Sequence, residues 1–252
     1  MTTAKELSCV ALIPARSGSK RVKNKNVRLL GGHPLLAYTI ATAKASGVFK
    51  RVIVSTDSAE TAAIAKKYGA EVPWLRPTEF AADNSPDIEW LEHTLQQLEA
   101  AGETYDAFAL LRPTSPFRQT ATIQRAWNYF TSLTGVDSIR AIELCTQHPA
   151  KMWQVTGEGT TARINPVMVN PDKTGTPWHS TPYQALPKIY AQNASLEIAW
   201  TRVPLQQHTI AGREIAPFIT EGHEGFDINN QEDWIIAEYM LEHQQVTLPI
   251  II

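Results

Sequence analysis

Residues 11–26 read ALIPARSGSKRVKNKN, a short apolar run that ends at Pro14 and leads into a loop of small and cationic residues. Between residues 16 and 28 the chain carries six Lys or Arg residues interleaved with serine and glycine, and no Asp or Glu occurs between Glu6 and Asp57. Glycine and serine let main-chain N–H groups approach an anion closely, while fixed cations offset its charge. Open α/β sheets bind ligands just beyond the ends of their strands, so this position favours a phosphate-binding loop over a solvated basic turn.

The loop follows neither of the common nucleotide-binding patterns. The sequence Gly18-Ser19-Lys20 lacks the earlier glycine and the following Ser or Thr of a P-loop, and the G-x-G-x-x-G fingerprint of dinucleotide-binding proteins is absent. Charge and position alone therefore indicate the ligand, a group such as a triphosphate.

Length and composition favour one large domain, or one domain with a sizeable excursion. The chain has 252 residues, of which 43% are hydrophobic, and a formal net charge of −2. This balance does not indicate a general affinity for nucleic acid or membranes, and no apolar run approaches the length of a membrane span. Cys9 and Cys145 lie on apolar segments far apart, which is typical of reduced core thiols in a cytoplasmic protein, and the start of the chain does not resemble a signal peptide.

Strand-like and helix-like segments alternate along the first part of the chain. Short apolar runs predict strands at 8–13, 51–55, 71–75, 107–111 and 137–144. Capping residues and helical periodicity predict helices at 34–46, 59–68, 87–101 and 120–133. This alternation in short steps predicts an α/β fold with a doubly wound, mostly parallel sheet that carries helices on both faces.

The pattern changes at His148. Short apolar pieces separated by turn sequences predict antiparallel or irregular structure, so we expect an excursion over residues 146–188 within a single domain of residues 1–252. Regular structure is expected to resume after this excursion, with segments at 189–203 and 214–220 and a last helix at 231–245.

Asp227 and Asn229 lie two residues apart at an expected strand end. Side chains two apart on a strand share a face, so an acid and an amide oxygen there would bind a Mg²⁺ ion already held by phosphates. The alternative is an Asx turn that caps the last helix. Scattered histidines and the absence of a G-x-S-x-G sequence argue against a zinc site and a serine hydrolase.

Five motifs occur in order along the chain. They are IPARSGSK with KN at 13–26, VSTD at 54–57, LRPTEFAAD at 75–83, PTSPFR at 113–118, and Asp227-Ile228 before the last helix. Together they resemble the motifs of the acylneuraminate cytidylyltransferases, also called CMP-sialic acid synthetases, and the resemblance runs almost from end to end. The H-x-S-G-T-D-R stretch of the related Kdo-specific branch is missing.

This resemblance implies a Rossmann-like nucleotidyltransferase that takes CTP and an acidic acceptor, releases pyrophosphate, requires Mg²⁺ and forms a homodimer through the excursion. Arg16, Lys20 and Lys25 would hold the triphosphate, and Asp227 would bind the metal beside Asn229. These three cations and Asp227 are the implied catalytic residues. The implied nucleotide contacts are Ala15, Arg16, Ser17, Gly18, Ser19, Lys20, Asn26, Arg76, Asp83 and Ser85.

The acceptor half departs from the family pattern. Tyr183 stands where an arginine is common, Glu197 where an aromatic residue is common, Asn229 where the second metal-binding Asp is usual, and Arg112 where many relatives have Gln. The implied acceptor contacts are Arg112, Thr114, Ser115, His148, Lys151, Tyr183, Gln192, Asn193 and Glu197.

Several readings of the activity stay open. The first is transfer of CMP to a nonulosonic, sialic-acid-like acid, with Arg112 and Lys151 as candidate partners of its carboxylate. A small phosphonate acceptor is the alternative, since both cations would also bind its oxygens. A nucleotide-sugar glycosyltransferase would use an acid pair at the metal, which Asn229 breaks, and a catalytically silent nucleotide-binding protein stays open for the same reason.

Overall fold

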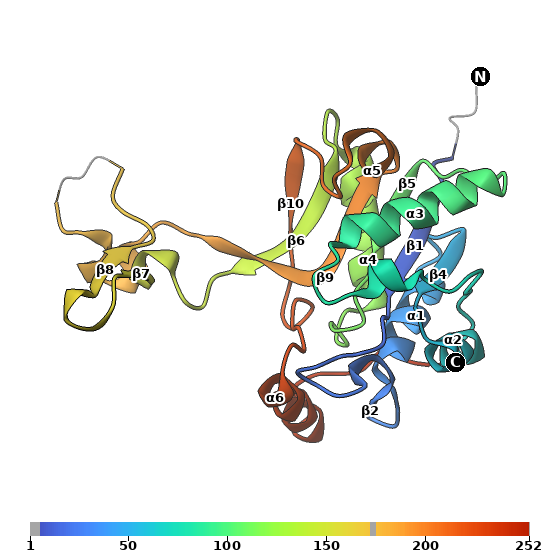
Figure 1. Ribbon diagram of the computed structural model, residues 1–252, viewed down its shortest axis with the longest axis horizontal. Helices are drawn as coiled ribbons and strands as arrows, with labels where there is room; N and C mark the ends of the chain where they lie inside the picture. Colours follow the sequence, from blue (N-terminus) through green and yellow to red (C-terminus); the bar gives the residue numbers. More distant parts are fainter. Residues whose placement is uncertain (1–5, 172–174, 252) are drawn as a thin grey trace. The chain divides into compact units, whose positions relative to one another are not determined.

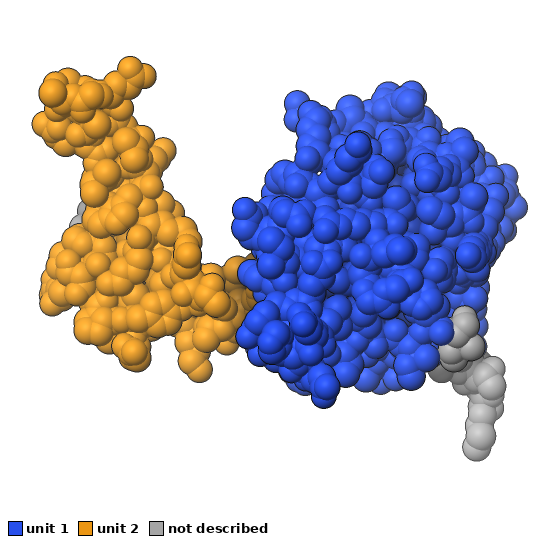
Figure 2. All heavy atoms as spheres, turned by 90° about the horizontal axis from the view of Figure 1, so that it is seen from below, with its two compact units in different colours: residues 1–142, 193–252 blue, residues 143–192 orange. Residues whose placement is uncertain are grey.

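The structure is a computed structural model that describes residues 6–171 and 175–251. Its chain, traced in Figure 1, divides into two compact units, one of residues 1–142 and 193–252 and the other of residues 143–192 (Figure 2). The expected excursion falls inside the second unit.

The first unit is built around a six-stranded sheet with the strand order β10-β6-β9-β5-β1-β4. Its strands are β1 (Cys9–Pro14), β4 (Arg51–Ser55), β5 (Ala107–Leu110), β6 (Ser138–Leu144), β9 (Tyr190–Trp200) and β10 (Ile215–Ile219). Strand β1 pairs in parallel with β4 and β5, and β10 pairs in parallel with β6, whereas β9 is antiparallel to β5. The predicted α/β fold with a mainly parallel sheet is confirmed.

Helices cover both faces of this sheet. Helices α1 (Leu35–Ala45), α2 (Ala59–Lys67) and α4 (Thr120–Ser132) share one core with the sheet, and α3 (Asp87–Ala100) and α5 (Arg202–Gln207) share the other. The hairpin β2 (Leu29–Leu30) and β3 (His33–Pro34) precedes α1, and α6 (Gln231–Glu242) lies away from the sheet (Figure 1). Ser58 caps α2, because its side chain accepts a hydrogen bond from the Thr61 amide at 3.2 Å. Over the described ranges, no helix has the length and apolar character needed to cross a membrane.

Strand β1 explains why the opening run is continuously apolar. Its residues alternate between two cores, with Ala11 and Ile13 in the core that contains residues of α1, α2 and α4, and with Val10 and Leu12 in the core that contains residues of α3. A strand that is buried on both faces has no polar side, so it shows no polar alternation. Pro14 then ends the strand and directs the chain into the cationic loop.

The predicted strand at 71–75 is wrong. Only Glu71 pairs with the sheet, through an isolated bridge to Ile53 in β4. The Glu71 amide donates to Val52 and its carbonyl accepts from Val54, but Pro73 has no N–H with which to extend the ladder. Trp74 instead packs against the α3 core. The apolar composition of this segment therefore reflects packing and not strand pairing.

Helix α6 and the end of the chain form a third apolar cluster. Trp234 is fully buried there, and the Arg28 guanidinium lies over its ring at 4.1 Å from the centroid. Leu248 and Ile251 pack against the same cluster, so the apolar tail of the sequence covers the body of the first unit. This cluster fixes the position of the segment that precedes α6, which carries Asp227 and Asn229.

The second unit has little regular structure. It contains the antiparallel pair β7 (Trp153–Thr156) and β8 (Arg163–Pro166), and the expected antiparallel pieces are present. Short 3-10 turns complete it: η3 (Pro149–Lys151), η4 (Gly159–Thr161), η5 (Trp178–Ser180) and η6 (Tyr183–Ala185). Val155 and Ile164 are both more than half exposed, at 65% and 57%.

Candidate active site

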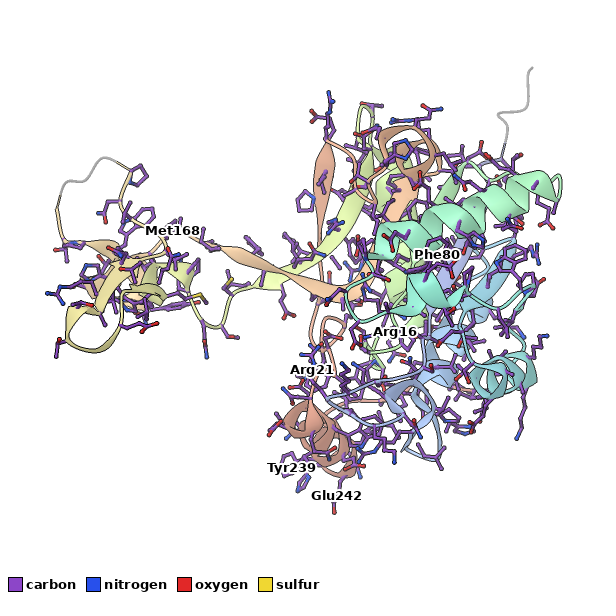
Figure 3. The ribbon with its side chains drawn as sticks, in the orientation of Figure 1. Arg16, Arg21, Phe80, Met168, Tyr239 and Glu242 are labelled. Atoms are coloured by element: carbon purple, nitrogen blue, oxygen red, sulfur yellow. The ribbon has the colours of Figure 1, made fainter. Side chains whose placement is uncertain are left out.

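A cavity of about 370 Å³ lies beyond the carboxyl ends of β1 and β5. Its lining combines the loop after β1, the start of α3, the residues after β5 and Asn229. Arg16 and Arg21 on that loop are labelled in Figure 3. Two acids, Asp83 and Asp87, face six cations in the lining: Arg16, Lys20, Arg21, Lys25, Arg76 and Arg112. This excess of positive charge makes the cavity a site for a polyanion.

The backbone of the loop has a defined shape. Gly18 adopts a φ of +74°, a conformation that side chains with a Cβ rarely reach. The Asn26 side chain donates to the carbonyl of Arg16 at 3.2 Å, which ties the two ends of the loop together. Asn26 therefore shapes the loop and also lines the cavity.

Asp57, which follows β4, fixes the loop through two hydrogen bonds with Ser17. One carboxylate oxygen accepts from the Ser17 amide at 2.7 Å and the other from the Ser17 hydroxyl. Burial raises the pKa of Asp57, but these Ser17 hydrogen bonds outweigh it and the pKa is lowered. The Ala15 amide is likewise bonded, to the Ser55 carbonyl at 2.9 Å. The amides of Ala15 and Ser17 thus attach the loop to β4 and the residues after it, and the nucleotide contacts implied for these two residues stay predictions.

Asp83 lies against two of the predicted phosphate-binding cations. Arg16 Nη1 donates to Asp83 Oδ1 at 2.9 Å and to the Ala81 carbonyl at 3.2 Å, and Lys20 pairs with Asp83 Oδ2. The hydrogen bonds from Lys20 and Arg16 lower the pKa of Asp83. Ser85 does not line the cavity, and its hydroxyl donates to the Glu79 carbonyl at 2.7 Å. It belongs to the turn that carries Asp83.

Arg76 is nearly buried at the cavity wall. Its Nε donates to the Ser55 hydroxyl and its Nη2 to the Ser55 carbonyl, both at 3.0 Å, and its guanidinium lies over the Trp90 ring. Burial lowers the pKa of Arg76 to about 10. An arginine held in this way presents a fixed edge to the cavity.

Lys25 joins the loop to the Asp227 segment. Its Nζ donates to the Ile228 carbonyl at 2.7 Å. Burial lowers the pKa of Lys25, and the nearby Asp227 charge opposes that shift. Asp227 Oδ2 accepts from Asn229 Nδ2 at 2.6 Å, so the two side chains are in contact, but the expected strand end is wrong, because residues 226–229 form no strand.

Asn229 lines the cavity whereas Asp227 does not, and the oxygens of this pair are of the kind that fits a divalent cation. Asp227 Oδ1 is buried and has no hydrogen-bond partner among the described residues, so an acceptor oxygen is left for a cation. Over the same residues no cluster of three metal-ligating side chains occurs. The cap of α6 is made by Asn230, whose side chain accepts from the Asp233 amide at 2.9 Å, so Asp227 is not used for capping.

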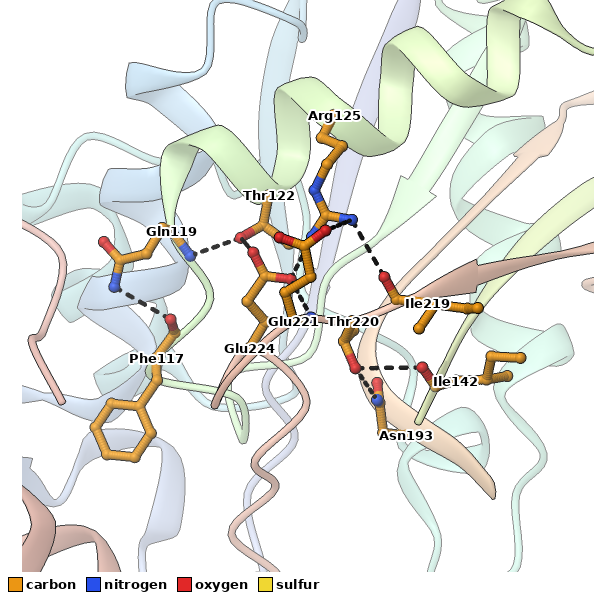
Figure 4. A network of polar contacts seen from close by, with 10 residues as sticks. All are labelled: Phe117, Gln119, Thr122, Arg125, Ile142, Asn193, Ile219, Thr220, Glu221 and Glu224. Atoms are coloured by element: carbon orange, nitrogen blue, oxygen red, sulfur yellow. Dashed lines mark hydrogen bonds and ion pairs between the residues drawn. The ribbon is translucent and has the colours of Figure 1, made fainter. Parts of the chain in front are cut away.

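A network around Glu224 anchors the chain that leads to Asp227 (Figure 4). The Glu224 carboxylate accepts from the Thr122 hydroxyl and from Arg125 Nη2, both on α4, and from the Glu221 amide at 2.9 Å. Arg125 Nη1 donates to the Ile219 carbonyl at 3.1 Å. Sequence reasoning missed these residues, because no local pattern signals a contact between positions this far apart.

The acceptor residues predicted in the first unit have different surroundings. Arg112 and Thr114 line the cavity, and the Thr114 carbonyl accepts from the Ile228 amide at 2.9 Å. Ser115 is buried and lies outside the lining.

Asn193 donates to the Thr220 hydroxyl at 2.9 Å and accepts from the Ser195 amide at 3.1 Å, so its amide group is bonded at both ends. Glu197 is buried and forms ion pairs with two arginines.

The remaining predicted acceptor residues belong to the second unit. His148 Nδ1 accepts from the Ala150 amide at 3.1 Å, and its Nε2 lies 2.8 Å from the Pro187 carbonyl. Lys151 Nζ donates to the carbonyls of His179 and Thr181 at 2.8 and 2.6 Å. The Tyr183 hydroxyl donates to the Cys145 carbonyl, and Gln192 is exposed. Their roles at an acceptor site stay predictions.

The sheet and the cationic cavity at its carboxyl edge define an α/β protein with a site suited to a polyanion. Residues 10–197 match the family described as cytidylyltransferase, and the chain belongs to this family. The protein is a nucleotidyltransferase and, within that class, belongs with the acylneuraminate cytidylyltransferases.

Three relatives illustrate the similarity. The CMP-N,N'-diacetyllegionaminic acid synthase of Legionella pneumophila is 31% identical over 252 residues, covering 95% of this chain and 98% of the relative. The post-translational flagellin modification protein B of Campylobacter coli is 31% identical over 242 residues, with coverage of 96% and 97%. The N-acylneuraminate cytidylyltransferase of Escherichia coli O18:K1:H7 is 47% identical over 124 residues, which are 49% of this chain and 28% of that protein.

Solved structures confirm the fold. A CMP:2-keto-3-deoxy-manno-octonic acid synthetase complexed with CTP superposes with a TM-score of 0.65 at 11% identity, over 94% of this chain and 99% of the other. A 4-diphosphocytidyl-2C-methyl-D-erythritol synthase from Anaerococcus prevotii gives a TM-score of 0.59 at 12% identity. At this level of identity the likeness concerns the fold alone.

Proposed function

We propose that the protein transfers CMP from CTP to a nonulosonic acid and releases pyrophosphate. The observation that carries the proposal is the cavity in which six cations gather beyond β1 and β5. Relatives named as synthases of CMP-linked legionaminic acid, similar over nearly their whole length, support the acceptor class.

This reaction requires the protein to position CTP and the acceptor and to offset the negative charge of the triphosphate. An acceptor hydroxyl attacks the α-phosphorus of CTP and gives up its proton to solvent, the new O–P bond forms, and the bond to the departing pyrophosphate breaks in line. Arg16 and Lys20 offset the charge of the triphosphate. Lys25 also lines the cavity, and its hydrogen bond to the Ile228 carbonyl keeps the Asp227 segment close to the triphosphate. Arg76 and Asn26 would flank the ribose and cytosine.

Asp227 and Asn229 would hold a Mg²⁺ ion together with phosphate oxygens, and the unpartnered Asp227 Oδ1 supports this assignment. The ion would offset charge on the triphosphate and on the leaving group. Since Asn229 is neutral, the Asp227–Asn229 pair supplies one carboxylate.

A pyrophosphate-release screen tests the proposed function. CTP and Mg²⁺ are combined with a panel of nonulosonic acids, including legionaminic, pseudaminic and sialic acids, and with small phosphonates in parallel wells. The proposal predicts release with at least one nonulosonic acid and with CTP over the other nucleoside triphosphates. Release with phosphonates only would assign the alternative acceptor class, and CTP binding without release from any acceptor would assign a silent nucleotide-binding protein.

We also propose that the protein is a homodimer that uses the second unit. Val155, Ile164 and Val167 are exposed apolar residues of that unit, and such surfaces are typical of protein interfaces. Light scattering with size-exclusion chromatography would show a dimer for the wild type, and a Val155→Asp/Ile164→Asp variant would elute as a monomer. A wild-type monomer would refute this assignment.

A further inference from the structure

Four charged side chains form a row in which the sign of the charge alternates, and the first two of them, Asp87 and Arg112, line the cavity. Arg112, which follows β5, places Nη2 2.7 Å from Asp87 Oδ2 and 3.5 Å from Glu197 Oε1. Glu197, on β9, is in turn 2.9 Å from Arg140 Nη2 on β6. Since β9 lies between β5 and β6 in the sheet, the order Asp87, Arg112, Glu197, Arg140 follows the sheet across three strands.

Both the main chain and the guanidinium group of Arg112 are held by neighbouring residues. Its carbonyl accepts from the buried Arg118 guanidinium at 3.3 Å, which holds the main chain. Its guanidinium is held by Asp87 and Glu197, and for each carboxylate the closest approach is to the same nitrogen, Nη2. Burial lowers the pKa of Arg112, but Asp87 and Glu197 outweigh this effect and the pKa is raised, so the side chain stays cationic.

Glu197 itself is poorly suited to contact an acidic acceptor. Its side chain is 6% exposed, and its two oxygens face Arg112 and Arg140. A buried carboxylate would also repel a carboxylate placed beside it. Its position between two arginines is that of a residue that orients its neighbours.

We propose that Arg112 binds the acceptor carboxylate and that Glu197 is a positioning residue that holds Arg112 in place. This inference rests on the proposed function. Arg112 lines the cavity, and a guanidinium has five N–H donors, so donors besides Nη2 are present for a planar carboxylate. Arg140 completes the arrangement because it compensates the second oxygen of Glu197. This assignment changes the predicted role of Glu197 from contact to support.

The test compares Glu197→Gln with a matched control. The substitution keeps the shape of the side chain but removes its charge, so Arg112 loses one of its two anchors. We expect the acceptor KM to rise about tenfold, with the CTP KM unchanged and kcat altered by less than about threefold. The control is Glu103→Gln, because Glu103 shares Arg51 with Glu71 in an equivalent arrangement away from the cavity. It should leave both KM values unchanged.

A second variant keeps the inference testable if Glu197→Gln folds poorly. Arg112→Lys preserves the charge but removes the planar group, and it should raise the acceptor KM to a similar extent. The double variant should be no worse than the more severe single variant, because the two residues act together. Thermal melting and CTP calorimetry establish that each variant is folded.

The outcomes separate the two claims. An active wild type whose acceptor KM is unmoved by Glu197→Gln and Arg112→Lys would overturn the inference and leave the proposed function standing. Equal increases in the KM values of CTP and acceptor would also overturn it. A wild type that releases no pyrophosphate with any acceptor would overturn the proposed function and the inference with it.

Discussion

Asp83 and Arg16 lie 67 positions apart in the sequence, yet their side chains meet at 2.9 Å, and the same carboxylate also pairs with Lys20. A triphosphate that binds Arg16 and Lys20 would have to compete with this carboxylate. The turn that carries Asp83, closed by the hydrogen bond from Ser85 to Glu79, would then shift when nucleotide binds.

Asp83→Asn should therefore tighten CTP binding. The variant keeps the size of the side chain but removes the charge that competes for two cations, so we expect the dissociation constant to fall roughly fivefold at low salt. Calorimetry at two salt concentrations measures the change, and CMP, which lacks the β- and γ-phosphates, is the control ligand. Weaker CTP binding would show that Asp83 contributes a favourable contact to the nucleotide.

Lys20→Ala should lower the rate of pyrophosphate release by about two orders of magnitude, since it removes a charge placed to offset the triphosphate. Lys23→Ala is the matched control, because Lys23 belongs to the same loop but is exposed and does not line the cavity. Steady-state assays with saturating acceptor measure both variants. Equal rates for Lys20→Ala and the wild type would refute the assignment of the loop.

Asp227→Asn should raise the Mg²⁺ concentration needed for half-maximal activity by about tenfold or more, because the single carboxylate of the proposed metal site is lost. Asn229→Asp should shift it in the opposite direction. Mn²⁺ binding measured by electron paramagnetic resonance gives a readout that is independent of turnover, and Glu232→Gln in the first turn of α6 is the control. Unchanged metal dependence for Asp227→Asn would place the metal elsewhere.

Asp57→Asn should reduce stability near neutral pH and weaken its dependence on pH in acid. The folded-state pKa of Asp57 is lowered from 3.8, so in the range below 3.8 the unfolded chain binds more protons than the folded one. The contribution of Asp57 is therefore fully present above 3.8 and is lost as the pH falls through the folded-state pKa. Urea unfolding at several pH values measures it, with Glu60→Gln as the control on α2. A parallel pH profile for Asp57→Asn and the wild type would contradict the role given to the Ser17 hydrogen bonds.

The sequence allows much of the fold to be predicted because its local signals agree. The apolar run of β1 and the serine cap of α2 each identify an element and one of its ends. The segment at 71–75 misleads because Trp74 and its neighbours are apolar for packing, while Pro73 interrupts the ladder. A buried irregular segment and a paired strand can both have an apolar amino-acid composition, so composition alone does not distinguish them.

The site is only partly predictable for a different reason. The cationic loop is contiguous, so its charge is visible in the sequence. The residues that position it are distant, since Asp57 contacts Ser17 across 40 positions and Glu224 contacts Arg125 across 99. Only the folded sheet brings such pairs together. The contact between Arg112 and Glu197 is another long-range pair of this kind.

A crystal structure with CTP and Mg²⁺ tests the central claim most directly. The account predicts that the triphosphate lies within hydrogen-bonding distance of Arg16 and Lys20, in the cavity beyond β1, with Asp83 moved away from both cations. A nucleotide bound elsewhere, with the Arg16–Asp83 pair intact, would contradict it.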